Sequence, residues 1–126
     1  MILKKIILVL NLIFEGTMGV LFAAYPHIVF ENASGMVLAL SRMFGFAAIT
    51  MALLSFLVLR KRSYASKIGL ITLAIFHWGI LIATILNVYE AMVPIVFAFI
   101  HAIFALAFTY LAAKECAGGV CKTCHN

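Results

Sequence analysis

The chain has 126 residues, of which 67% are hydrophobic and only 10% are charged, with a formal net charge of +5. Soluble domains are about 45–50% apolar and about 25% charged, and so short a chain cannot hide this much apolar surface from water. The basic residues flank the apolar segments and form no patch interleaved with aromatic residues. These features exclude a soluble enzyme, a nucleic-acid-binding domain and a disordered tail, and they indicate an integral membrane protein with one domain.

Four apolar segments are long enough to cross the hydrocarbon core of a bilayer, which requires a helix of roughly 20 residues. They cover about residues 6–25, 36–59, 68–88 and 91–113. Proline, glycine and asparagine fall in the connections, and no succession of alternating segments suggests a barrel. We therefore predict an all-α fold in which residues 1–115 form an antiparallel bundle of four transmembrane helices and residues 116–126 form a tail.

The basic residues predict the orientation of these helices. Eight of the nine fall on one side of the bundle: Lys4, Lys5, Arg60, Lys61, Arg62, Lys67, Lys114 and Lys122. The first and third connections contain Glu31 and Glu90 but neither lysine nor arginine. Because cytoplasmic loops carry the excess of basic residues, we expect both termini in the cytoplasm and the protein in a bacterial inner membrane.

Each predicted helix contains one ionisable residue within its apolar segment, and charges at that depth are costly. These residues are Glu15, Arg42, His77 and His101. Small or polar residues recur near them at helical spacing: Asn11, Gly19 and Phe22; Ser41, Gly45, Ala48, Ala52 and Ser55; Thr84 and Asn87; Ala98, Ala105 and Ala112. Small residues allow helices to approach closely in lipid, so we predict that these stripes face the interior.

The four ionisable residues admit several interpretations. Glu15 and Arg42 fit an ion pair between the first two helices, or a carboxylate that handles protons or binds a ligand. His77 and His101 each fit a hydrogen bond to a neighbouring helix. Alternatively, Glu15 and His77, which we expect at the same level, fit a site that passes protons or orients a quinone-like headgroup. Axial ligation of haem b is a weaker alternative, because neighbouring helices pack only about 8–10 Å apart. We expect a ligand-binding or proton-handling site and assign no catalytic residue.

The tail holds all three cysteines of the chain. Cys116, Cys121, Cys124 and His125 together match a Cys₃His metal site in number, and thiolates favour soft ions such as zinc, copper or mercury. Gly118 and Gly119 would allow the chain to curl and close the site. The string C-x-x-C-H also matches covalent haem c attachment, although the predicted cytoplasmic location disfavours it. The remaining alternatives are a disordered tail with incidental thiols and a palmitoylated Cys116 beside the membrane.

The segments FEGTMGVLF and SRMFGFAAITMALLSFLVLRKR resemble the small DoxX-like four-helix membrane proteins. The shared features are a glycine-containing first helix, the Arg-x-x-Gly opening of the second helix at Arg42–Gly45 and a basic middle loop. The resemblance covers about residues 6–113 and leaves out the cysteine tail. It implies a membrane subunit or accessory protein, sometimes linked to quinone or thiol oxidation.

These observations favour a redox-accessory membrane protein that is not an enzyme on its own. Its expected partners are the lipid bilayer, a small hydrophobic or quinone-like ligand, and a second membrane subunit or further copies of the same chain, with no nucleic acid. Two alternatives stay open: a soft-metal transporter or acceptor that uses the tail, and a haem-bearing electron-transfer protein.

Overall fold

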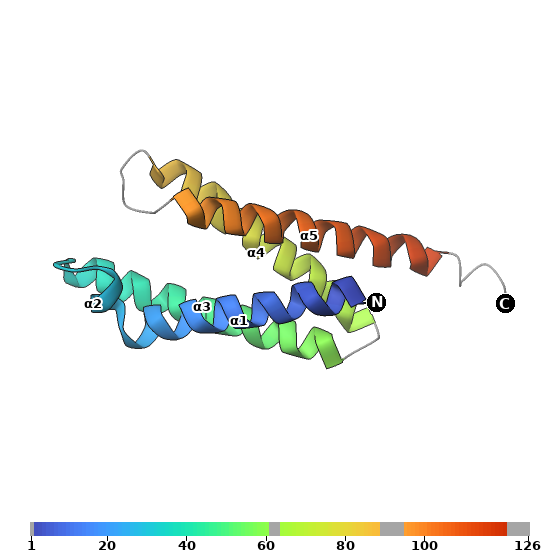
Figure 1. The fold of residues 1–126 in the computed structure, drawn as a ribbon, viewed down its shortest axis with the longest axis horizontal. Helices are drawn as coiled ribbons and strands as arrows, with labels where there is room; N and C mark the ends of the chain where they lie inside the picture. The colour runs from blue at the N-terminus through green and yellow to red at the C-terminus, as the bar shows by residue number, and fades with distance from the viewer. Residues whose placement is uncertain (1, 61–63, 89–94, 121–126) are drawn as a thin grey trace. The chain divides into compact units, whose positions relative to one another are not determined.

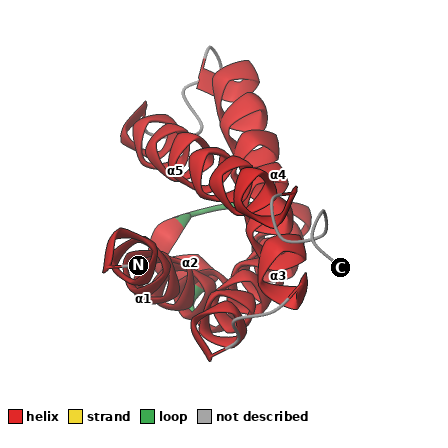
Figure 2. Cartoon of the chain, turned by 90° about the vertical axis from the view of Figure 1, so that its right-hand side faces the viewer, coloured by secondary structure: helices red, strands yellow, loops and turns green. Residues whose placement is uncertain are grey.

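The computed structural model describes residues 2–60, 64–88 and 95–120 (Figure 1). The helices, in chain order, are α1 (Ile2–Ala24), α2 (Pro26–Val29), α3 (Gly35–Arg60), α4 (Tyr64–Val88) and α5 (Ile95–Val120). The described ranges contain no strand (Figure 2). All helices except α2 are long and apolar enough to cross a membrane. The predicted all-α class and the four candidate spans are confirmed.

The chain divides into two compact units, Met1–Arg60 and Lys61–Asn126, which are described separately. In the first unit, α1 and α3 pack as an antiparallel pair, because Asn11 contacts Ser55 whereas Gly19 lies against Gly45. The buried residues of α1 and α3 are Leu8, Asn11, Glu15, Gly19 and Phe22, and Ser41, Gly45, Ala48, Ala52, Ser55 and Val58. They include every member of the two predicted stripes, so the predicted inward faces are confirmed.

The turn between α1 and α3 is shaped by local chemistry. Pro26 is the first residue of the short helix α2, where its fixed φ is favourable and its missing N–H is no loss. Asn32 adopts a left-handed conformation with φ of 60°, which asparagine tolerates better than most residues. Ser34 precedes α3, and its Oγ accepts a hydrogen bond from the amide of Val37 at 3.4 Å. This cap explains why α3 begins at Gly35.

In the second unit, α4 and α5 form another antiparallel pair. Ser66 Oγ donates a hydrogen bond to the carboxylate of Glu115 at 3.2 Å near one end, and His77 contacts His101 further along. The apolar core of the pair consists of Leu70, Leu73, Ala74, Ala98, Ala105, Phe108, Leu111 and Ala112. The predicted inward positions of α5, which are Ala98, His101, Ala105 and Ala112, are all buried. In α4, His77 and Thr84 are buried as predicted, and the side chain of Asn87 lies outside the described part.

The helix bounds differ from the predicted ones: α1 begins at Ile2 and not at residue 6, and α4 begins at Tyr64 and not at residue 68. Two further differences concern the tail and the first connection. Helix α5 continues to Val120, well past the predicted end at residue 113, so Cys116, Gly118 and Gly119 lie in helical backbone. The predicted curl at the two glycines is therefore absent. The second difference is the short helix α2, which lies within the connection predicted between the first two spans. The predicted start of the last helix at residue 91 falls outside the described residues.

Candidate functional site: a buried imidazole pair

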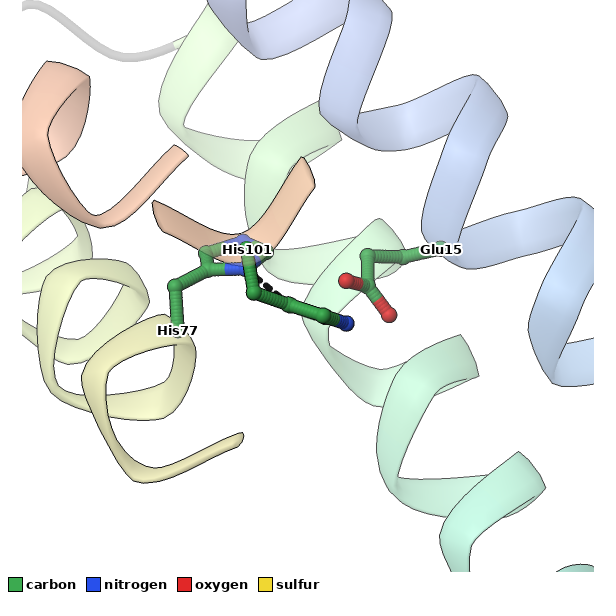
Figure 3. Close-up of side chains that lie close together, drawn as sticks. All are labelled: Glu15, His77 and His101. Atoms are coloured by element: carbon green, nitrogen blue, oxygen red, sulfur yellow. Dashed lines mark hydrogen bonds between the residues drawn. The ribbon is translucent and has the colours of Figure 1, made fainter. Parts of the chain in front are cut away.

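The histidines of the two candidate spans of the second unit contact each other directly. Nδ1 of His77 lies 2.9 Å from Nδ1 of His101, so one ring donates the hydrogen bond and the other accepts it (Figure 3). Both side chains are buried, with relative exposures of 0% for His77 and 2% for His101. Because α4 and α5 are antiparallel, these residues reach the same level from opposite ends of their helices. Within the second unit, the structure thus brings together the predicted site residues His77 and His101.

Aromatic rings hold the imidazole pair in place. The ring of His77 stacks on Phe104, with centroids 5.0 Å apart, and on Phe108, with centroids 5.5 Å apart. Phe76 meets the same imidazole edge-on at 5.3 Å. Phe104 and Phe108 follow His101 by three and seven residues, so they project from the same face of α5. This spacing is the sequence signal that could have identified them as walls of the site.

The geometry also decides how a haem would fit. Two axial histidines coordinate an iron from opposite faces of the porphyrin, so the macrocycle must lie between their rings. A direct hydrogen bond of 2.9 Å, with ring centroids 5.1 Å apart, leaves no space for it. His77 and His101 in this arrangement do not fit axial ligation of haem b.

The first unit has buried polar residues of its own. Nδ2 of Asn11 donates a hydrogen bond to Oγ of Ser55 at 2.9 Å, and this contact joins α1 to α3. Glu15 lies one helical turn beyond Asn11 and is only 1% exposed. Figure 3 shows its carboxylate projecting from α1. The predicted burial of Glu15 is thus confirmed.

Arg42 does not join that group. Its side chain is exposed, and it forms no hydrogen bond or ion pair with any residue of the described ranges 2–60, 64–88 and 95–120. Arg42 directly follows Ser41, which faces α1, and one residue turns an α-helix by about 100°. The guanidinium therefore leaves the α1–α3 interface. The predicted ion pair between Glu15 and Arg42 is wrong for this structure.

The cysteine tail is described only in part. Cys116 lies near the end of α5 and is half-buried as a free thiol. Cys121, Cys124 and His125 lie outside the described residues. A soft-metal site or a haem c attachment in the tail therefore stays a prediction.

Two hydrogen bonds between α4 and α5 were not predicted from the sequence: Trp78 with Thr109, and Ser66 with Glu115. The indole nitrogen of Trp78 donates to Oγ1 of Thr109 at 3.1 Å, and this hydroxyl in turn donates to the carbonyl of Ala105 at 2.7 Å. Thr109, Ser66 and Glu115 do not stand out within their helices, so the sequence did not predict these contacts. The Trp78–Thr109 and Ser66–Glu115 bonds fix the register of α4 against α5 and thereby support the imidazole pair.

Comparisons with protein-family models, with curated proteins and with solved structures find no match to this chain. The functional interpretation therefore depends on the helices and on the imidazole pair.

Proposed function

We propose that this chain is an integral membrane protein with four transmembrane helices, both termini cytoplasmic, and a buried imidazole pair that holds a proton or the polar headgroup of a small hydrophobic ligand. The 2.9 Å contact between His77 and His101 inside an apolar helix pair carries the proposal. Polar groups at membrane depth are costly and are retained mainly for function. The resemblance to DoxX-like proteins favours a redox-accessory subunit of an inner membrane.

The outer surfaces of the helices support the membrane location. Large apolar side chains are widely exposed on α3, α4 and α5, for example Met43 at 68%, Leu86 at 71% and Ile103 at 66%. In water this surface would drive aggregation, whereas lipid tails solvate it at no cost. The exposed aliphatic faces and the buried polar stripes are together typical of helices that pack in lipid.

The hydrogen-bonded pair is chemically suited to a proton. Each neutral imidazole has one N–H and one bare nitrogen, and the bridge uses one of each. A proton added to Nε2 of the donor ring makes that ring an imidazolium, which passes its Nδ1 proton across the bridge. The second ring then releases its own Nε2 proton, so one proton enters and one leaves. The Nε2–H of the second ring could equally donate a hydrogen bond to the carbonyl of a quinone-like headgroup.

The single tryptophan provides an internal probe for this proposal, because Trp78 directly follows His77 on α4. The full chain in lipid nanodiscs would be titrated with a short-chain benzoquinone while Trp78 fluorescence is recorded. We expect saturable quenching that is lost in His101→Gln. His27→Gln is the matched control, since His27 is exposed on the short helix α2. Quenching that rises linearly and is identical in all three proteins would reflect partition into lipid and would contradict ligand binding at the pair.

A further inference from the structure

We infer that His77 and His101 form a binding site for one divalent transition-metal ion of the zinc class, held by the two Nδ1 atoms that now share a proton. The inference rests on the proposed role of the imidazole pair as a ligand site and names the ligand class. Neutral imidazole is a preferred ligand of zinc, copper and nickel. The two Nδ1 atoms already lie 2.9 Å apart.

The distances fit such an ion with a small rearrangement. A tetrahedral ion bonded to both nitrogens at about 2.0–2.1 Å would hold them about 3.3 Å apart, with ring centroids about 5.2 Å apart. The observed centroids are 5.1 Å apart, and the rings are inclined by 37°. The rings therefore need to tilt about their present positions but do not need to separate. The helices can stay where they are when the ion enters.

The protonation states of the two rings also allow a metal ion to replace the shared proton. In the apo pair, the donor ring carries its proton on Nδ1 and the acceptor ring carries its proton on Nε2. When the ion binds, the donor ring takes the Nε2 tautomer, so both Nδ1 lone pairs become available and no proton is released overall. The two imidazoles fill half of a tetrahedral shell, and water or other donor groups complete it.

The surroundings favour retention of the ion. Phe104 and Phe108 stack on His77 and limit how far its ring can turn away from His101. Neither histidine is more than 2% exposed, so bulk water has little access to the metal–nitrogen bonds. A preorganised, poorly hydrated ligand pair loses little conformational entropy when it binds an ion.

The test uses the full chain with its tail ligands removed, so that thiols cannot contribute. This tail variant carries Cys116→Ser, Cys121→Ser, Cys124→Ser and His125→Ala. Equilibrium dialysis against Zn²⁺ in lipid nanodiscs should give one bound ion per chain. His101→Gln in the same background should weaken binding at least tenfold, whereas His27→Gln should leave it unchanged. Zinc K-edge absorption of the loaded tail variant, which needs no histidine substitution, should show scattering from two imidazoles.

Three results would overturn the inference: no zinc uptake by the tail variant, equal uptake by its His101→Gln derivative, or an absorption spectrum without imidazole scattering. Saturable quinone quenching in a protein that takes up no zinc would reject the metal site and leave the proposed ligand function standing. Zinc uptake without saturable quinone quenching would support the metal site and would reject binding of a quinone-like headgroup at the pair.

Discussion

Gly45 of α3 lies directly against the backbone of α1. A methyl group at this position would lie 2.8 Å from the carbonyl oxygen of Gly19 and 2.9 Å from Cα of Ala23, and closer still to the amide nitrogen of Ala23. All three are backbone atoms, which cannot rotate away as a side chain can. Gly45→Ala must therefore push α1 and α3 apart.

The size of the effect follows from these distances. Favourable contacts between carbon atoms lie at about 3.5–4.0 Å, so the helices would have to separate locally by about 0.6–1 Å. Overpacking of this kind costs about 1–3 kcal/mol, and the higher helix propensity of alanine returns about 0.5–1 kcal/mol. We expect Gly45→Ala to lower the free energy of unfolding by about 1 kcal/mol, within a range of about 0–2.5 kcal/mol.

Reversible unfolding in mixed detergent micelles would measure this change, and the chain provides matched controls. Gly79 has no atom within 4 Å of the added methyl, and at Gly16 the nearest atom is Cβ of Ala52 at 3.9 Å. Both alanine variants should be as stable as the parent protein or more stable by up to about 1 kcal/mol. If Gly45→Ala unfolds at the same denaturant concentration as Gly79→Ala, the close approach of the two helices is refuted.

Three further predictions concern the hydrogen bonds, the aromatic stack and the topology. A double-mutant cycle of Asn11→Ala and Ser55→Ala should give a coupling of about 0.6–1.7 kcal/mol, as for other interhelical hydrogen bonds in membranes, and strict additivity would contradict the bond. Phe108→Ala should lower the free energy of unfolding by about 3–5 kcal/mol in the same micelle assay, because this fully buried ring leaves a cavity against His77; a loss below about 1 kcal/mol would argue against the stack. A reporter fused after Asn126 should show cytoplasmic activity, since the basic residues flank that side, and a periplasmic signal would reverse the orientation.

The sequence by itself determined the helical class and the inward faces. Composition alone predicts apolar spans, because a chain with so few charged residues can only be solvated by lipid. Within each span, small and polar residues at helical spacing identify the packed side, as the burial of Gly19, Gly45 and Ala105 confirms. The 3.6-residue period makes this a local property, readable without knowledge of neighbouring helices.

Only the tertiary structure decided which polar groups meet. The same α3 stripe that was predicted correctly excludes Arg42, because one residue of rotation carries it off the face that Ser41 shares with Gly45. The contact between His77 and His101 depends on the register of α4 against α5, which side chains distant in sequence set, such as Trp78 with Thr109. Composition and periodicity describe each helix alone. The distance between two rings on different helices depends on the axial offset and rotation of one helix against the other, and no single segment of the chain encodes this packing.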